Sequence, residues 1–263
     1  MKSDIVWRLY KGKISNFVIK PCYKVPNFVI FNEKSAEFCD ATHFLCYILL
    51  LNMIRHDIKD FLKTLPKDIT LVAATKYGSV DDLKNLYDAG VNNFGENRVD
   101  AFISKYEALR NLDIKWHFIG HLQRNKTHLV LDKIDYLHSL DSLELAKVIN
   151  KYRHSPLNCF IEVSINLEEN KNGVPYYEVK DFIKECLQYQ NINIVGLMMM
   201  AVADSSEESL HEQFRKLKEL QIEISKELNI EIPYLSMGMS HDYKIAIEEG
   251  ATHIRLGRIL FEE

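Results

Sequence analysis

The sequence predicts a single (β/α)8 barrel of the TIM type, an α/β fold, with an N-terminal appendage. From Met53 onward, eight short apolar runs alternate with longer amphipathic segments, which is typical of parallel β/α architecture. Several of these runs are apolar throughout, as expected of parallel strands that are covered on both faces. A doubly wound sheet would usually show a Gly-x-Gly-x-x-Gly turn after its first strand, and that turn is absent. About 210 residues are enough for a compact barrel.

Each apolar run is expected to form one strand: 69–74, 91–94, 114–119, 136–140, 159–165, 192–200, 234–239 and 252–256. The segments between them carry helix-start signals. Ser79 is expected to cap the helix after the first strand. Ser205 and Glu208 are expected to form a capping box before a long helix. Ser240 is expected to cap the helix after the seventh strand.

Residues 1–52 differ in composition from the rest of the chain. They hold three of the five cysteines and nine of the 28 aromatic residues, but one of the ten glycines. Seven basic residues against four acidic ones give this part a charge of +3, and the remainder carries −7. Two interpretations stay open: an appendage of unknown structure, or a translation start at Met53. The expected domains are therefore 1–52 and 53–263.

Composition and charge exclude several classes of protein. The chain is 47% hydrophobic and 27% charged, as in ordinary globular proteins, and its net charge of −4 argues against nucleic-acid or anionic-lipid partners. The longest apolar run, 44–51, is too short to span a bilayer. Five cysteines without a Cys-x-x-Cys pair indicate free thiols in a reducing cytoplasm. His117 and His121 lack a third ligand nearby, so no metal site is expected.

A lysine stands where the first barrel strand is expected to end. Functional groups of such barrels cluster at the carboxyl ends of the strands, and Lys76 follows the run 69–74. Burial and a cationic neighbour would lower the pKa of its amine and make it nucleophilic, as a Schiff base requires. The alternative is a lysine that simply reaches solvent at the rim, and its position alone favours this alternative.

The ends of the seventh and eighth strands are where barrels usually bind phosphate, at backbone N–H groups and a helix N-terminus. Ser240 at a helix start and Gly257 after a strand supply these parts, and Arg255 adds a positive charge. Taken alone, Ser240 is explained as a cap and Gly257 as a turn. Their combination with Lys76 and Arg255 favours a site for a phosphorylated ligand.

Six stretches of the chain match a known family in order and spacing. They are LVAATK (71–76), FGENR (94–98), WHFIGHLQRNK (116–126), GLMM (196–199), LSMGMS (235–240) and IRLG (254–257). The chain from Met53 to Phe261 resembles the pyridoxal phosphate homeostasis proteins of the YggS/PROSC type. The third and fifth stretches are highly specific in combination.

The resemblance implies an alanine-racemase-like barrel that carries pyridoxal 5′-phosphate (PLP). It implies that Lys76 forms the internal aldimine with this cofactor. It also implies that Ser240 and Gly257 hold the phosphate, that Arg255 faces the pyridine nitrogen, and that Asn97 lines the pocket near the ring.

The chain departs from the family pattern at several positions. Arg258 stands where the family usually has a small hydroxyl residue that contacts phosphate. This arginine either replaces a neutral hydrogen bond with a charged one or points away, and we include it among the expected cofactor-binding residues. The residues after the lysine are Tyr77 and Gly78, the usual glycine after the last strand region is missing, and residues 1–52 have no counterpart.

Two functions are compatible with these features. The first is a cytoplasmic PLP-homeostasis protein that holds PLP reversibly as a lysine aldimine, has no catalytic residue and passes the cofactor to PLP-dependent apo-enzymes. The second is a PLP-dependent amino-acid racemase or decarboxylase. Racemases of this fold carry a second, β-rich domain that supplies a catalytic tyrosine across a dimer, and here the sequence ends at the eighth strand. An arginine at the pyridine nitrogen also weakens the cofactor as an electron sink, although racemases share this feature. We therefore expect the first function, and a monomer.

Overall fold

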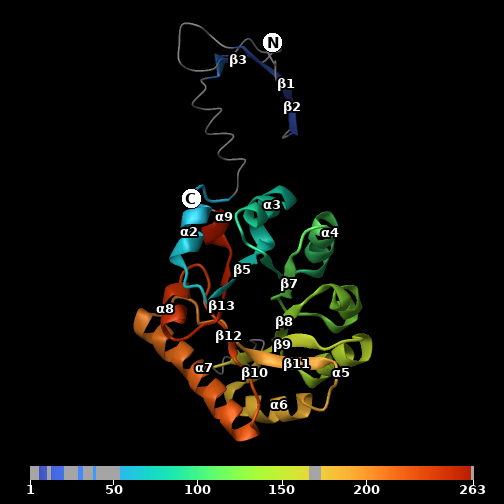
Figure 1. Ribbon diagram of the computed structural model, residues 1–263, viewed down its shortest axis with the longest axis vertical. Helices are drawn as coiled ribbons and strands as arrows, with labels where there is room; N and C mark the ends of the chain where they lie inside the picture. Colours follow the sequence, from blue (N-terminus) through green and yellow to red (C-terminus); the bar gives the residue numbers. More distant parts are fainter. Residues whose placement is uncertain are drawn as a thin grey trace. The chain divides into compact units, whose positions relative to one another are not determined.

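A computed structural model describes residues 54–165 and 173–261, together with four strands nearer the N-terminus (Figure 1). The chain divides into two compact units, residues 1–53 and 54–263. The four strands of the first unit form an antiparallel sheet in chain order: β1 (Val6–Tyr10), β2 (Lys13–Lys20), β3 (Val29–Phe31) and β4 (Phe38–Cys39). No period in the sequence predicts these strands.

Eight parallel strands close into a barrel in the second unit: β5 (Thr70–Ala74), β6 (Asn93–Glu96), β7 (Lys115–Phe118), β8 (Tyr136–Leu140), β9 (Leu157–Ser164), β11 (Ile192–Met198), β12 (Tyr234–Ser236) and β13 (His253–Leu256). Neighbours in this order pair with each other, and β13 pairs with β5 to complete the ring. The predicted (β/α)8 barrel is therefore confirmed. A short extra strand, β10 (Val174–Pro175), pairs with β9.

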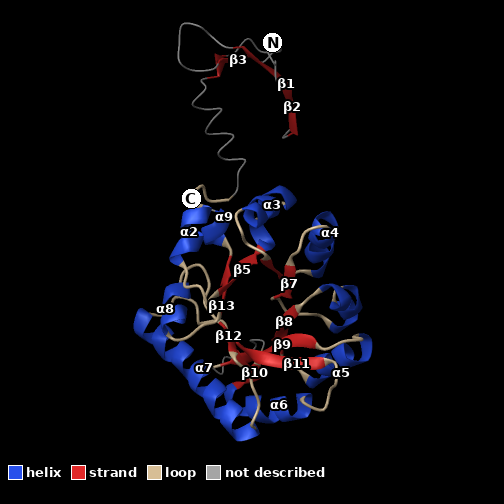
Figure 2. Cartoon of the chain, viewed as in Figure 1, coloured by secondary structure: helices blue, strands red, loops and turns tan. Residues whose placement is uncertain are grey.

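Helices form an outer layer around the ring of strands, as Figure 2 shows. They are α2 (Ile58–Thr64), α3 (Val80–Asp88), α4 (Val99–Leu109), α5 (Leu143–Tyr152), α6 (Val179–Cys186), α7 (Glu207–Leu228), α8 (Tyr243–Glu248) and α9 (Arg258–Phe261). Four 3-10 turns connect elements: η1 (Thr75–Tyr77), η2 (Arg124–Leu129), η3 (Leu131–Lys133) and η4 (Tyr176–Glu178).

One expected helix cap is confirmed and two are wrong. Ser79 caps α3 in a reciprocal capping box with Asp82. Helix α7 is capped by Ser206, one residue later than expected, because the Ser205 hydroxyl donates to the Val202 carbonyl instead.

Ser240 does not cap α8. Asp242 precedes this helix, and its carboxylate accepts the N–H of Met239 at 2.5 Å, which closes the turn that leads into α8. The Ser240 hydroxyl instead accepts hydrogen bonds from backbone N–H groups that follow β13.

Aromatic side chains join the strands to the helices that cover them. Phe102 of α4 contacts Trp116 of β7 edge to face, with ring centroids 5.3 Å apart, and Trp116 contacts Phe94 of β6 at 5.9 Å. All three side chains are buried. Such contacts fix α4 against strands β6 and β7.

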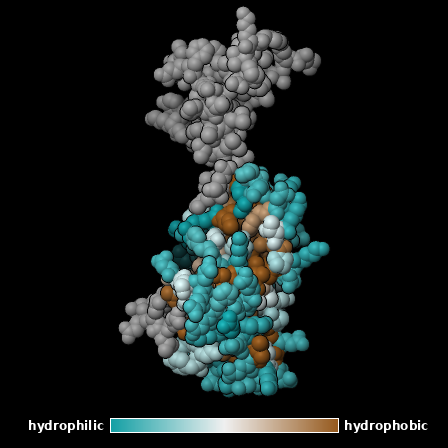
Figure 3. Space-filling view, turned by 90° about the vertical axis from the view of Figure 1, so that its left-hand side faces the viewer, coloured by the Kyte–Doolittle hydropathy of each residue, from teal (hydrophilic) through white to brown (hydrophobic). Residues whose placement is uncertain are grey.

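The outer surface is mostly polar. The face drawn in Figure 3 shows hydrophilic residues with separate, small apolar patches between them. Within the described part of the chain, no helix combines the length and the apolar character needed to cross a membrane.

Candidate functional site

The predicted site residues lie at one end of the barrel. Lys76 lies in η1 directly after β5, Asn97 follows β6, and Gly257 follows β13. Because β13 pairs with β5, with Leu256 opposite Ala73, the end of β13 lies beside the turn that carries Lys76. The two segments lie close together: a Cβ built on Gly257 would lie 3.9 Å from Tyr77 Cδ2.

Lys76 itself is exposed. Strand β5 ends at Ala74, and the next residues turn outward in η1, so the lysine does not close a buried strand as expected. Its Nζ lies 5.2 Å from the centroid of the Tyr77 ring, which is also exposed. Of the two interpretations, the structure supports a lysine that reaches solvent at the rim, which its position in the sequence alone favoured.

A buried glutamate fixes the turn that carries Lys76. Glu96, at the end of β6, is 1% exposed. One of its carboxylate oxygens accepts from Thr75 Oγ1 at 2.9 Å and from Lys105 Nζ at 2.7 Å, and the other accepts the N–H of Asn97 at 2.8 Å. Lys105, on α4, also donates to the Thr75 carbonyl at 2.6 Å. The Glu96–Lys105 pair thus ties the residue before Lys76 to Asn97, a role that the sequence analysis missed.

Glu96→Gln is expected to lower the free energy of unfolding by about 3 kcal/mol, because removing one partner of a buried ion pair leaves the other charge buried and unpaired. The double variant Glu96→Gln with Lys105→Met should recover most of this loss. Chemical denaturation of both single variants and the double variant measures the coupling. The exposed pair Asp81–Lys84, at 3.3 Å, is the matched control, and breaking it should cost about 0.5 kcal/mol or less. If the double variant lost the sum of the two single-variant losses in the free energy of unfolding, the pairing would be contradicted.

Asn97 carries an unsatisfied buried acceptor. Its Oδ1 is buried and accepts no hydrogen bond from any of the described residues. Such orphaned atoms are uncommon in folded proteins, since leaving one unpaired costs about 1–3 kcal/mol. Gly120 fixes the backbone at this position, because a Cβ there would lie 2.4 Å from the Asn97 carbonyl oxygen. A ligand that offers a donor to Asn97 Oδ1 would satisfy this atom.

Arg255 is buried within β13 and is 5% exposed. Its Nη1 donates to the Ser236 carbonyl at 2.8 Å and to Ser236 Oγ at 2.7 Å, and its Nη2 donates to the Met199 carbonyl at 2.9 Å. A guanidinium has five N–H groups. Among the described residues these bonds therefore leave the Nε–H and one Nη2–H for a ligand. Burial lowers the pKa of Arg255 to about 10, a shift that the charges of Asp242 and Glu162 oppose, so it stays cationic at neutral pH.

Three polar groups meet at the end of β13, and we call them the cradle: the Ser240 hydroxyl and the backbone N–H groups of Gly257 and Ile259. Ser240 Oγ accepts the backbone N–H groups of Gly257 and Ile259, both at 3.3 Å. Gly257 is buried, yet a Cβ built on it would meet no described atom closer than 3.5 Å, and its backbone does not require glycine. Packing around Gly257 thus has room for a methyl group, in ordinary contact with Ala74. Arg258, the next residue, is exposed.

Polar side chains also line the barrel interior below Arg255. His117 of β7, His138 of β8 and His253 of β13 are buried, and their rings contact one another and Tyr136. Burial holds the pKa values of His117 and His138 well below the ordinary value, and it lowers that of His253 to about 4. All three histidines are therefore neutral near pH 7.

Glu162 of β9 completes this interior. Burial, followed by the charge of Asp141, raises the pKa of the Glu162 carboxyl to about 7, while Arg255 opposes the rise. The sequence signal for these groups is polar residues at alternate positions of apolar strands, because alternate residues face the barrel interior. The sequence analysis noted His117 only as a possible metal ligand and passed over His138, Glu162 and His253. Among the described residues, no group of three or more potential ligands could hold a metal.

The fold and the site together define an alanine-racemase-like barrel protein. Residues 50–263 match the family model described as alanine racemase, N-terminal domain. The chain belongs to the family of pyridoxal phosphate homeostasis proteins. It is 41% identical over 196 residues to the protein of this name from Aquifex aeolicus, which covers 73% of this chain and 86% of the relative. It is 38% identical to the one from Synechocystis, over 77% of this chain and 94% of the relative.

Solved structures show the same barrel. PipY of Synechococcus elongatus, a member of the COG0325 family, has been solved without PLP and with PLP bound. The PLP-free form has a TM-score of 0.74 and 30% identity, and the match covers 77% of this chain and 97% of that one. The PLP-bound form has a TM-score of 0.73 and 29% identity, over 78% and 100% of the two chains. Alanine racemase from Corynebacterium glutamicum, with a TM-score of 0.65 and 14% identity, shares the fold.

Proposed function

We propose that this protein binds PLP at the carboxyl rim of the barrel and serves in PLP homeostasis. The observation that carries the proposal is the cradle at Gly257, where two backbone N–H groups share the Ser240 hydroxyl as their acceptor and the absent side chain of Gly257 leaves room that packing does not require. The names of the relatives and the PLP-bound PipY structure support the choice of ligand.

Each residue at the rim has a proposed task. Ser240 and Gly257 hold the phosphate, and Arg255 offers its remaining N–H groups to the pyridine nitrogen. Asn97 accepts a hydrogen bond through its unpaired Oδ1. Lys76, exposed at the same rim, would condense through its amine with the cofactor's aldehyde, whose oxygen leaves as water. We expect Arg258 to contribute long-range attraction to phosphate, because its side chain is exposed.

We further propose that the protein holds PLP without robust turnover. PLP supplies an electron sink for carbanion chemistry, and a cationic arginine at the pyridine nitrogen keeps that nitrogen unprotonated and weakens the sink. Arg255 remains cationic at neutral pH. The naming of the relatives supports the same conclusion. In this proposal the protein is a cytoplasmic monomer that passes PLP to apo-enzymes. The alternative, a racemase or decarboxylase, predicts measurable turnover of an amino acid.

An absorbance titration of the full chain with PLP tests the proposal. Covalent attachment to a lysine gives a violet absorbance band that saturates at one cofactor per chain. The absence of this band and of any saturable binding would overturn the proposal. Incubation of the loaded protein with single amino acids, followed by chiral chromatography and amine detection, decides between holding and turnover.

Gly257→Ala is expected to weaken PLP binding about 10- to 150-fold while leaving the fold intact. The added methyl group fills the cradle and costs a hydrogen bond to a charged ligand, which contributes about 1.5–3 kcal/mol. It meets nothing closer than 3.5 Å in the described protein, so the melting temperature should barely change. Pyridoxal, which lacks the phosphate, is the control ligand, and its affinity should be the same for both proteins. An equal loss for both ligands would place the phosphate elsewhere.

A further inference from the structure

A chain of hydrogen bonds crosses the barrel interior from Arg255 to Asn93. Arg255 Nη1 lies 2.7 Å from Ser236 Oγ, which lies 2.9 Å from His138 Nδ1. His138 Nε2 lies 2.9 Å from His117 Nδ1, and His117 Nε2 lies 3.0 Å from Asn93 Oδ1. Five strands supply these five residues, one residue each, and the three central side chains are fully buried.

The arginine end allows one direction of donation. A guanidinium can only donate, so Ser236 Oγ accepts from Arg255. The hydroxyl hydrogen of Ser236 then has His138 Nδ1 as its partner, and pointing it elsewhere would leave a buried donor unpaired at a cost of about 1–3 kcal/mol. His138 Nδ1 is therefore an acceptor, and the neutral ring carries its proton on Nε2.

The asparagine end demands the same direction independently. Asn93 donates through Nδ2 to Asn92 Oδ1 at 2.8 Å, so its Oδ1 is the atom that faces His117. This oxygen can only accept, so His117 carries its proton on Nε2 and accepts through Nδ1. That Nδ1 then receives the Nε2–H of His138. Both ends thus fix the same tautomer at both histidines, and the donors of Ser236, His138 and His117 are all used.

We propose that Asn93, His117 and His138 are positioning residues for Arg255, which act through Ser236 to hold its guanidinium in a single orientation. While its own hydrogen is committed to His138, the Ser236 hydroxyl has a fixed orientation and presents a lone pair to Arg255. A change of tautomer at either histidine would put a proton on His138 Nδ1 and remove the acceptor of the Ser236 hydroxyl hydrogen. The hydroxyl would then turn, and its contact with the Arg255 guanidinium would weaken. The link to the cofactor rests on the proposed function, whereas the direction of the hydrogen bonds does not.

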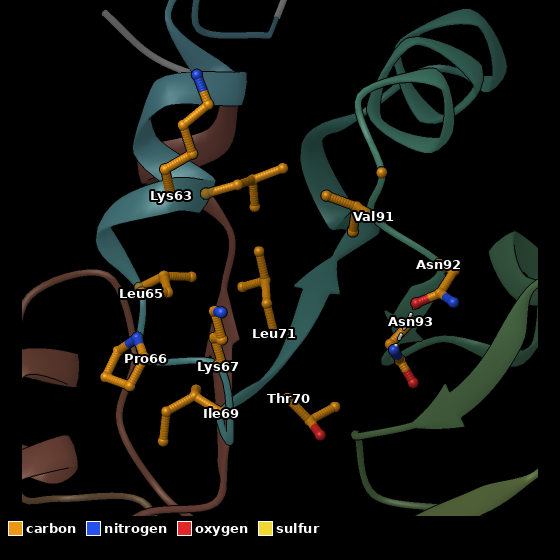
Figure 4. A pocket seen from close by; sticks show the side chains of 12 residues that line it. Lys63, Leu65, Pro66, Lys67, Ile69, Thr70, Leu71, Val91, Asn92 and Asn93 are labelled. Atoms are coloured by element: carbon orange, nitrogen blue, oxygen red, sulfur yellow. Dashed lines mark hydrogen bonds between the residues drawn. The ribbon is translucent and has the colours of Figure 1, made fainter.

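The far end of the chain is accessible from outside the barrel. Asn93 is the first residue of β6, at the amino ends of the strands, and it lines a hollow of about 590 Å³ together with Asn92, Thr70 and Lys67 (Figure 4). Asn93 is half-buried and Asn92 is exposed. A substitution at Asn93 therefore perturbs the chain from the opposite end of the barrel, without touching the rim.

Nitrogen-15 NMR of the histidine side chains in the cofactor-free full chain, at pH 7.5, tests the proposal directly. We expect His117 and His138 each to show a protonated Nε2 and an unprotonated Nδ1. Their signals are assigned with His117→Gln and His138→Gln. A protonated Nδ1 on either ring in the wild type would overturn the proposal, whether or not the protein binds PLP.

Two neighbouring asparagines provide the matched pair of variants. Asn93→Leu removes the terminal acceptor, so His117 and His138 should lose their single tautomer, and PLP affinity should fall about tenfold, equivalent to about 1.4 kcal/mol. Asn92→Leu removes the acceptor of Asn93 Nδ2 but keeps Asn93 Oδ1, which the His117 N–H still holds, so the tautomers and the PLP affinity should change far less than in Asn93→Leu. His253 is bonded to Thr252 and takes no part in this series of hydrogen bonds, so it should keep its tautomer in both asparagine variants. Identical histidine signals in the Asn93 and Asn92 variants would refute the proposal. Intact tautomers in a protein that fails to bind PLP would refute only the proposed function.

Discussion

Lys76→Ala is expected to abolish the violet absorbance band of the PLP-loaded protein completely. Lys76 is exposed beside Gly257 in the described structure, at the end of the strand that pairs with β13, and it lies in the turn that Glu96 and Lys105 tie down. Without its amine no covalent bond to the aldehyde can form there. PLP should still bind through its phosphate, although more weakly and with the spectrum of the free aldehyde. The measurement is an absorbance titration of variant and wild type.

Reduction with borohydride and peptide mapping provide the control. The wild type should carry the reduced cofactor on Lys76, and the variant should carry none. Lys84→Ala, which removes an exposed lysine from the neighbouring helix α3, should behave as the wild type does. If the variant keeps the band, with the cofactor trapped on another lysine, the assignment of Lys76 is wrong.

Acidification is expected to destabilise the fold by about 4 kcal/mol between pH 7.5 and pH 5. His117, His138 and His253 are buried and neutral, with lowered pKa values, whereas in the unfolded chain they take up protons near pH 6.5. The unfolded state thus binds more protons below pH 6.5, and stability falls as the pH falls. Three such groups would together cost about 6 kcal/mol at pH 5.

Glu162 opposes this loss. Its pKa is about 7 in the fold against an ordinary 4.5, so the folded state binds the extra proton between these values, and stability rises as the pH falls. This offsets about 2 kcal/mol of the loss by pH 5. Glu162→Gln should therefore steepen the acid loss to about 6 kcal/mol. Urea denaturation at several pH values measures both curves. A free energy of unfolding that stays flat from pH 7.5 to pH 5 in the wild type would contradict neutral buried histidines.

The barrel follows from the sequence because its signals are local. Each of the eight apolar runs lies on a strand, and the run 136–140 coincides with β8. Boundaries differ where an apolar run continues beyond the paired segment: the run 234–239 reaches past β12, which ends at Ser236. Helix caps were less predictable. Ser205 and Ser206 are both plausible caps in the sequence, and the choice depends on the contact of Ser205 with Val202.

The sequence predicts which residues form the site, but it does not predict the hydrogen bonds and ion pairs that connect them. Strand order brings Lys76, Asn97 and Gly257 to one rim, and that follows from the barrel alone. The exposure of Lys76 depends on where the chain leaves β5, which the sequence does not reveal. The Glu96–Lys105 pair and the chain from His138 to Asn93 join residues on different elements. Only the register between neighbouring strands decides which of these side chains meet.

The bonds that Ser240 makes to the Gly257 and Ile259 amides have a consequence for how a ligand leaves. In the protein described here those two amides already have an acceptor. An incoming anion must replace the hydroxyl, so it gains only the difference between two hydrogen bonds at each amide. On departure the hydroxyl returns, and no buried donor is exposed during the exchange. Under the proposed function, the cradle would therefore favour exchange of the phosphate over its permanent retention, as the release of PLP to another protein requires.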